Sequence, residues 1–281
     1  MNRIFIFGLG YSATRIAASL GARNWEVLST GKGGMLSFED EGNVQMALAD
    51  ASHVLSSVPP GGDGTDPVLE RYGDRLGGKW LGYLSSTGVY GDSGGAWVDE
   101  SAPTGSGRRT ARTQCDASWR ERDALVFRLP GIYGPQRSAL DRVRQGKARR
   151  IDTPGQVFSR IHVDDIASAV LAAIIAGDAA PPGAYNLADD QPCHQNRVIE
   201  EACRLLDVAP PALQSLDDAG LNPIARAFYS ENRRIANGKA KRVLGWKPAF
   251  PDYSAGLRAL SAIISPANDR ADPEIASVDQ T

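Results

Sequence analysis

The fold of this chain is decided by residues 4–13, which read Ile4-Phe5-Ile6-Phe7-Gly8-Leu9-Gly10-Tyr11-Ser12-Ala13. The continuous apolar run predicts a strand buried on both faces, and the G-x-G-x-x-A pattern after it predicts a tight turn into a helix. In such a turn Gly8 permits the sharp bend, Gly10 lets the backbone approach a pyrophosphate, and Ala13 keeps the helix close to the sheet. The N–H groups of the first helical turn would face the phosphates. We therefore predict a dinucleotide site, with a ligand-free strand–helix turn as the alternative.

Further apolar segments alternate with helical stretches, as in the βαβ units of a parallel sheet. Strands are expected at residues 26–30, 53–58, 80–86 and 125–129, and helices at 14–20 and 166–176. The right-handed crossover rule then places helices on both faces of the sheet. The predicted fold class is α/β, a doubly wound parallel Rossmann sheet with a smaller C-terminal substrate-binding lobe. The interval before residue 53 is too short for a helix, a strand and a second helix, so residues 31–42 are expected to be abbreviated or poorly ordered.

The pattern changes beyond about residue 135, where helices, loops and proline pairs replace the regular alternation. We expect an NAD(P)-binding Rossmann domain at residues 1–180, to which 161–176 return, and a small lobe at 181–264. The polar residues 265–281, rich in Pro and Asp, predict a disordered tail.

The composition argues against several classes of partner. The 281 residues are 42% hydrophobic and 23% charged with a net charge of −2, so no overall basic field attracts nucleic acid or a membrane surface. Three cysteines without a C-x-x-C pair fit a reducing cytoplasm. The apolar run 167–176 is shorter than the roughly 20 residues of a membrane span, no signal-peptide pattern is present, and three scattered histidines predict no metal site. We expect a cytoplasmic protein that binds neither nucleic acid nor membrane.

The end of the second strand bears on the choice of dinucleotide. An acidic residue there would hold the ribose hydroxyls of NAD, but this chain has Ser29-Thr30-Gly31-Lys32, and the nearest carboxylate ahead, Glu39, comes late. Thr30 and Lys32 would instead meet a 2′-phosphate. We therefore favour NADP, with NAD as the alternative, and with an ordinary surface lysine as the other interpretation of Lys32.

Five segments in order resemble the extended short-chain dehydrogenases/reductases, the NAD-dependent epimerase/dehydratase family. They are S-S-T-G-V-Y-G at 85–91, F-R-L-P-G-I-Y-G-P at 127–135, R-I-H-V-D-D-I-A at 160–167, G-A-Y-N-L at 183–187 and L-G-W-K-P at 244–248. The resemblance covers roughly residues 3–262. The G-x-G-Y-S-A turn, the prolines at 59–60 and the arginines at 108–112 look like the atypical subgroup.

The resemblance implies roles for matching positions. The pyrophosphate would be lined by Gly8, Gly10, Tyr11, Ser12 and Ala13. The adenosine side would be bordered by Ser57, Val58 and Pro59, and the nicotinamide by Leu129, Pro130 and Ile132. Ser86, with Thr87 beside it, falls where the family has its catalytic hydroxyl.

The chain departs from the family at the Y-x-x-x-K-x-x-x-E motif. In register, Arg108 takes the Tyr place, Arg112 the Lys place and Asp116 the Glu place, at spacings that share one helix face. Arg112 would still reach the nicotinamide ribose. A guanidinium is not deprotonated in proteins, so Arg108 cannot replace the tyrosine as general base. The Tyr-dependent hydride mechanism should be absent or rebuilt.

Other residues near the expected site are assigned structural roles. Tyr90 and Tyr133 should hydrogen-bond to backbone, His162 should be structural, and Asp164 or Asp165 should cap the helix 166–176. The basic run 142–150 is expected on a solvated helix face, with an anionic substrate as the alternative. For Arg233 and Arg234 the same two interpretations remain.

Two functions stay open. The first is an oxidoreductase or epimerase with a non-standard active site and an unknown small-molecule substrate, with an anionic substrate among the alternatives. The second is a non-catalytic NAD(P)-sensing or scaffold protein, because the Tyr and Lys are missing. The sequence leaves both a monomer and a homodimer open.

Overall fold

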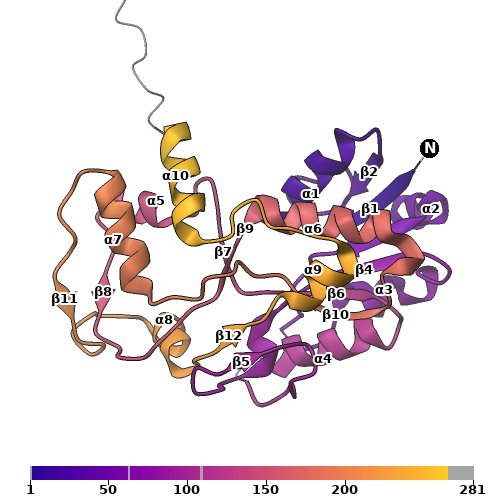
Figure 1. Cartoon of the computed structure of the whole chain (residues 1–281). Helices are drawn as coiled ribbons and strands as arrows, with labels where there is room; N and C mark the ends of the chain where they lie inside the picture. Colours follow the sequence, from indigo (N-terminus) through magenta and orange to yellow (C-terminus); the bar gives the residue numbers. More distant parts are fainter. Residues whose placement is uncertain (1, 63, 108–109, 265–281) are drawn as a thin grey trace, which may run out of the picture.

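The computed structural model describes residues 2–62, 64–107 and 110–264. Its centre is a parallel six-stranded sheet in the spatial order β10-β6-β4-β3-β1-β2 (Figure 1). The strands are β1 (Arg3–Phe7), β2 (Glu26–Ser29), β3 (His53–Ser56), β4 (Trp80–Ser86), β6 (Leu125–Leu129) and β10 (Gly183–Asn186). The predicted doubly wound α/β class is confirmed.

Helices cover both faces of the sheet, because the side chains of β1 alternate between two cores. Ile4 and Ile6 pack on the side of α1 and α6, and Phe5 and Phe7 pack on the side of α2, α3 and α4. All four side chains are fully buried, as the continuous apolar run predicts. The helices are α1 (Tyr11–Gly21), α2 (Glu41–Asp50), α3 (Pro67–Tyr72), α4 (Thr110–Arg120) and α6 (Val163–Ala176).

The interval between β2 and β3 is abbreviated, as expected. Residues 31–40 contain no helix or strand beyond a single bridge between Thr30 and Leu36, and α2 follows directly. Asp40 caps α2 by accepting a hydrogen bond from Asn43 N at 3.2 Å. With only one helix in this interval, β2 becomes an edge strand of the sheet.

A smaller core lies beside the sheet, on the left in Figure 1. Its helices α5 (Ala139–Arg144), α7 (Gln195–Leu205) and α10 (Tyr253–Ile264) pack around Leu140, Ile199 and Leu257. We predicted a division at residue 180. The sheet runs past that point because β10 pairs with β6, while α5 contributes to the smaller core. The chain therefore passes between the two cores more than once.

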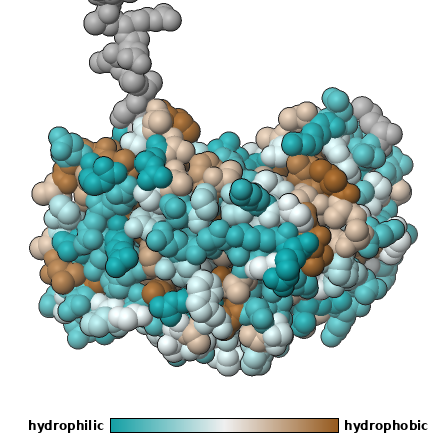
Figure 2. Space-filling model, in the orientation of Figure 1, coloured by the Kyte–Doolittle hydropathy of each residue, from teal (hydrophilic) through white to brown (hydrophobic). Residues whose placement is uncertain are grey.

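The remaining elements are short. They are η1 (Gly73–Arg75), η2 (Thr87–Tyr90), β5 (Trp97–Val98), β7 (Gly131–Tyr133), β8 (Arg150–Ile151), β9 (Arg160–His162), η3 (Gly177–Ala179), β11 (Leu213–Gln214), α8 (Pro223–Ala227), η4 (Phe228–Ser230), β12 (Arg234–Ile235) and α9 (Gly238–Leu244). The pairs β7–β9 and β5–β12 join segments far apart in sequence. On the face seen in Figure 2, apolar side chains form scattered patches on a mostly hydrophilic surface. Within the described ranges, no helix is long and apolar enough to cross a membrane. The predicted tail 265–281 lies outside the described residues.

The start of α6 corrects one expectation. The helix begins at Val163 and its N-cap is His162, whose Nδ1 accepts a hydrogen bond from Asp164 N at 3.2 Å. Asp164 forms an ion pair with Arg15 at 3.2 Å. Asp165 accepts hydrogen bonds from the backbone N–H groups of Ala249 and Phe250, at 2.7 and 3.0 Å. Neither carboxylate is the cap, because both already lie in the first helical turn.

Candidate functional site

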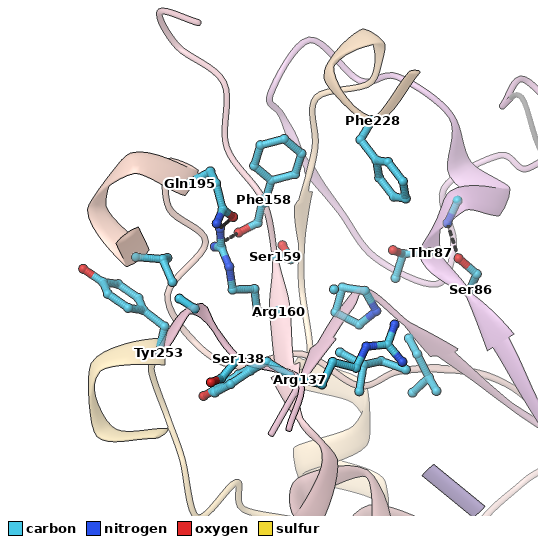
Figure 3. A pocket seen from close by; sticks show the side chains of 18 of the residues that line it. Ser86, Thr87, Arg137, Ser138, Phe158, Ser159, Arg160, Gln195, Phe228 and Tyr253 are labelled. Carbon is cyan, nitrogen blue, oxygen red and sulfur yellow. Dashed lines mark hydrogen bonds between the residues drawn. The ribbon is translucent and has the colours of Figure 1, made fainter. Parts of the chain in front are cut away.

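A cleft of about 1000 Å³ lies between the carboxyl ends of the sheet strands and the smaller core. The cleft adjoins the place where the strand order reverses. There β1 lies between β2 on one side and β3 on the other, so the chain continues in opposite directions from β1. Ligands of open α/β sheets bind at this kind of switch point. Figure 3 shows part of the lining, with Ser86 and Thr87 on one side and Arg160 and Tyr253 on the other.

The phosphate turn has the geometry that its glycines predict. Gly8 has φ of 81°, and an added Cβ would lie 3.0 Å from Val58 Cγ2, so the turn requires glycine there. The carbonyl oxygen of Gly8 accepts a hydrogen bond from Ser57 Oγ. Gly10 is the N-cap of α1 and supplies no capping side chain, and the first turn has no acidic residue. The N–H groups of this turn can therefore meet an anion.

Thr30 accepts two hydrogen bonds from the backbone of this turn. Its side chain is 1% exposed, its Oγ1 accepts a hydrogen bond from Gly8 N at 3.2 Å, and its carbonyl oxygen accepts one from Leu9 N at 2.7 Å. The expected contact of Thr30 with a 2′-phosphate does not fit this burial. Lys32 is exposed on the loop that follows β2. Glu39 forms an ion pair with Arg71.

The cleft brings together ten of the predicted site residues. They are Gly10, Tyr11, Ser12, Ser57, Ser86, Thr87, Arg112, Leu129, Pro130 and Ile132. The lining does not include Gly8, Ala13, Thr30, Lys32, Val58 and Pro59. Ala13 is fully buried in the core that α1 shares with β1, which fits its expected packing role. Val58 is half-buried and Pro59 is exposed.

The two hydroxyls predicted to act in catalysis lie at the carboxyl end of β4 (Figure 3). Ser86 is the N-cap of η2, and its Oγ accepts a hydrogen bond from Gly88 N at 3.1 Å. Thr87 is 4% exposed and lines the same cleft. Because the Gly88 bond occupies only a lone pair of Ser86, its hydroxyl proton can still be donated to a ligand.

Arg112 reaches the cleft from α4. Its Nη1 donates hydrogen bonds to Tyr83 OH at 2.7 Å and to the Leu84 carbonyl oxygen at 3.5 Å. The Tyr83 ring is stacked on Trp119 with centroids 5.3 Å apart, and burial raises the pKa of its hydroxyl. The hydroxyl therefore stays neutral. Arg108, in the place of the family tyrosine, lies outside the described residues.

Tyr133 and His162 pack together at the base of the smaller core. Tyr133 lines the cleft and donates a long hydrogen bond of 3.5 Å to the Asp252 carbonyl oxygen. The rings of Tyr133 and His162 meet edge-on with centroids 5.1 Å apart. His162 is 2% exposed, and burial lowers its pKa, so the imidazole is neutral at pH 7. These contacts fit the structural roles expected of both residues.

Most of the predicted basic residues are engaged by the protein itself. Arg150 pairs with Glu200 at 2.9 Å, and Arg149 donates to the Ala219 carbonyl oxygen. Arg234 donates to the Gly95 carbonyl oxygen. Of the basic run 142–150, only Arg142 lines the cleft. Arg233 also lines it and forms an ion pair with Glu231 at 2.9 Å.

No protein-family profile matches the chain. A solved protein from Silicibacter pomeroyi, described as functionally unknown and conserved, is 37% identical, with a TM-score of 0.82 over 94% of this chain and 99% of that one. Because this identity extends over nearly all of both chains, the two proteins belong to one family. The Escherichia coli protein YeeZ is 26% identical over 90% of this chain and 97% of its own.

Cofactor-bound structures share the fold at lower identity. The UDP-glucose 4-epimerase of Thermus thermophilus, solved with NAD, has a TM-score of 0.71 at 18% identity, over 94% of this chain and 99% of that one. A human epimerase family protein, solved with NADPH, has a TM-score of 0.72 at 16% identity, over 92% and 99%. This chain has the fold of the NAD-dependent epimerase/dehydratase family. The resemblance inferred from the motifs is confirmed.

A reductase is similar to part of this epimerase/dehydratase-fold chain. The 3-diazoavenalumate denitrifying reductase of a Streptomyces species is 32% identical over 144 residues. The match covers 47% of this chain and 45% of the reductase. The chain therefore matches less than half of that relative's length.

Sequence reasoning missed a buried network behind the cleft of this epimerase/dehydratase fold. Tyr90 OH donates to Asn186 Oδ1 and accepts from Arg128 Nη1, both at 2.8 Å. Arg128 in turn pairs with Asp116. The partners of the Tyr90 hydroxyl are side chains, so the prediction that it bonds to the backbone is wrong. The available signal was Arg128 itself, a lone charge within the apolar strand 125–129.

Sequence reasoning also missed the role of Glu100. Its Oε1 accepts a hydrogen bond from Asn186 N at 2.7 Å, and burial raises its pKa. The sequence around it, with Asp99 and Ser101 as neighbours, looks like an exposed turn. Glu100 instead holds the end of β10 beside the buried network.

Proposed function

We propose that this chain binds a nicotinamide dinucleotide in the cleft and acts as an oxidoreductase or epimerase of the epimerase/dehydratase type. The observation that carries the proposal is the turn from Gly8 to Gly10, which opens α1 at the edge of the cleft without a capping side chain. Ser57 holds this turn by its hydrogen bond to Gly8. Solved proteins of the same fold that bind NAD or NADPH support a nicotinamide cofactor.

NADP is the preferred cofactor in this proposal. With Thr30 buried, Lys32 is the remaining candidate for a 2′-phosphate contact, and it is exposed on the loop after β2. The carboxylate that follows in sequence, Glu39, is neutralised by Arg71. An ammonium group favours the extra phosphate of NADP, and a carboxylate in that position would favour the ribose hydroxyls of NAD.

The proposed active site is non-standard. A bound nicotinamide would supply or accept the hydride. Ser86 and Thr87 would donate hydrogen bonds to the reacting oxygen, and Arg112, fixed by Tyr83, would place a positive charge beside the ribose. Arg108 cannot remove a proton, because a guanidinium stays charged. The tyrosines that line the cleft are neutral at pH 7, since burial raises the pKa of Tyr11, Tyr133, Tyr229 and Tyr253. In this neutral form the four hydroxyls can donate hydrogen bonds, and none of them is a general base.

A non-catalytic NAD(P)-sensing or scaffold protein is the second candidate. It is favoured by the arginine in the tyrosine place and by the prior engagement of Arg112, whose Nη1 is bonded to Tyr83 and Leu84. A sensor needs the cofactor site and no proton relay. It would bind the cofactor tightly and turn over no substrate.

Calorimetric titration with NADP⁺, NADPH, NAD⁺ and NADH tests the cofactor, and a screen of carbonyl and alcohol substrates that follows NADPH absorbance tests turnover. Micromolar binding with preference for the phosphorylated pair, together with turnover of any substrate, supports the enzyme. Tight binding with no turnover supports the sensor. If none of the four dinucleotides binds, both candidates fail.

A further inference from the structure

The lining of the cleft carries an excess of positive charge. Five arginines line the cleft, against two carboxylates, Asp141 and Glu231. Both carboxylates are engaged: Asp141 accepts from Ser138 Oγ at 2.6 Å, and Glu231 pairs with Arg233. The cleft therefore favours an anionic ligand.

Two of the other arginines are held by the protein. Arg160 is 7% exposed and donates to the carbonyl oxygens of Phe158 and Cys193 and to Gln195 Oε1. Arg112 is bonded to Tyr83. The buried guanidinium of Arg160, with its several protein acceptors, has little capacity left for a ligand.

Arg137 and Arg142 are exposed, and the described residues give neither of them an ion pair. Of the two, Arg137 is the one that packs on an aromatic ring of the cleft. The guanidinium carbon of Arg137 lies 5.5 Å from the centre of the Tyr11 ring, so the side chain packs on that ring. In Figure 3 the Arg137 side chain extends into the cleft toward the side of Ser86 and Thr87. A carboxylate held there would accept a two-pronged contact next to the two hydroxyls.

An aromatic surface faces the same space. Phe228 is 45% exposed although it lines the cleft, and Figure 3 shows it pointing toward Thr87. Beside it, Tyr229 and Phe158 meet edge-on with centroids 5.6 Å apart. An exposed phenylalanine inside a cleft offers a flat apolar face, which a planar ring covers better than a polar sugar does.

We propose that the substrate is a small aromatic carboxylate, with its ring against Phe228 and its carboxylate on Arg137. The inference rests on the proposed function, because it fills the part of the cleft that the cofactor would leave. Because Phe228 points toward Thr87 in Figure 3, a ring held against it would lie beside the candidate hydroxyls. A nucleotide-linked sugar would bring a hydroxyl-rich, non-planar ring to this position, where Phe228 offers no hydrogen-bond partner for it.

Calorimetric titration of the full chain, alone and saturated with NADPH, tests this proposal. The probes are 4-hydroxycinnamate, its uncharged amide, 3-cyclohexylpropanoate, which has the charge without the flat ring, and UDP. We expect 4-hydroxycinnamate to bind about tenfold more tightly than the amide or the cyclohexyl acid, since each lacks one of the two contacts. Equal affinity for 4-hydroxycinnamate, its amide and 3-cyclohexylpropanoate, or tighter binding of UDP, overturns the proposal.

Matched variants locate the site. Phe228→Ala and Arg137→Gln should each weaken 4-hydroxycinnamate binding about tenfold. Trp97→Ala and Arg144→Gln, which change an exposed aromatic and an exposed arginine outside the cleft lining, should leave it unchanged. If Arg137→Gln weakens NADPH binding and leaves the acid unaffected, Arg137 serves the cofactor and the proposal fails. The titration without cofactor keeps the two questions separate, because the acid is measured even if no dinucleotide binds.

Discussion

Arg128 forms a two-pronged ion pair with Asp116, in which Nε lies 3.0 Å from Oδ2 and Nη2 lies 2.8 Å from Oδ1. Both side chains are 1% exposed. Ser85 Oγ adds a third hydrogen bond to Asp116, at 2.7 Å. The pair thus ties α4 and β6 to the residue immediately before Ser86, and it fixes the wall of the cleft on which the candidate hydroxyls stand.

Replacing Arg128 by Met should lower the free energy of unfolding by about 3–5 kcal/mol, because it leaves the Asp116 carboxylate buried with too few partners. Urea unfolding at pH 7 measures the change. Arg120→Met is the control: Arg120 also pairs with Asp116, at 3.2 Å, but its side chain is 41% exposed. That change should cost less than about 1 kcal/mol. Equal losses in the two variants would contradict a special role for the buried pair.

Gly10→Ala should weaken dinucleotide binding about tenfold or more without loss of stability. An added Cβ at Gly10 has only the Gly8 carbonyl oxygen within reach, at 4.0 Å, so the fold accepts it. The methyl group would instead stand where the backbone approaches the pyrophosphate. Gly21→Ala, at the other end of α1 with no atom near its added Cβ, is the matched control. Calorimetry with NADPH compares them, and unchanged binding by Gly10→Ala would remove this turn from the site.

Lys32→Gln should reduce the affinity for NADPH about fivefold to tenfold and leave that for NADH unchanged, because only NADPH carries the 2′-phosphate. Titration of both cofactors into the variant and the wild type gives the ratio. Lys147→Gln changes another exposed lysine, on the loop after α5, and should alter neither affinity. A parallel loss for both cofactors in Lys32→Gln would argue against specificity at this residue.

Asp189 should make the protein less stable as the pH rises. Burial raises the pKa of its carboxyl to about 8, and Oδ2 has no hydrogen-bond partner among the described residues. In the unfolded chain the group ionises near pH 4, so from about pH 4 to pH 8 the folded state holds a proton that the unfolded state has lost. Stability falls across this window and the effect is absent below it.

Asp189→Asn, which imitates the protonated acid, should therefore gain stability relative to the wild type as the pH rises from 5 to 8. Urea unfolding at pH 5, 6.5 and 8 measures the difference. Asp178→Asn, an exposed carboxylate in η3, is the control and should show no such trend. A constant difference between Asp189→Asn and the wild type would show that Asp189 is ionised in the folded protein.

The sequence predicts the features of this fold that depend on neighbours along the chain. The apolar run 4–7 and the glycines at 8 and 10 encode a strand and a turn whatever surrounds them, and both are found as expected. The burial of Thr30 could not be predicted in this way, because it depends on a residue far away in the sequence. The Thr30 hydroxyl accepts a hydrogen bond from the N–H of Gly8, 22 positions earlier. Likewise, Arg128 and Asp116 are recognisable as partners only once β6 and α4 lie side by side.

Tyr11 begins α1, and its hydroxyl donates a hydrogen bond of 3.0 Å to the carbonyl oxygen of Pro135, on the segment that leads into the smaller core. Widening the cleft at this end would break that bond, at a cost of about 1 kcal/mol. The bond therefore holds this end of the cleft at a fixed width. A dinucleotide would therefore meet a preorganised slot, and little of its binding free energy would be lost to closing the two halves around it.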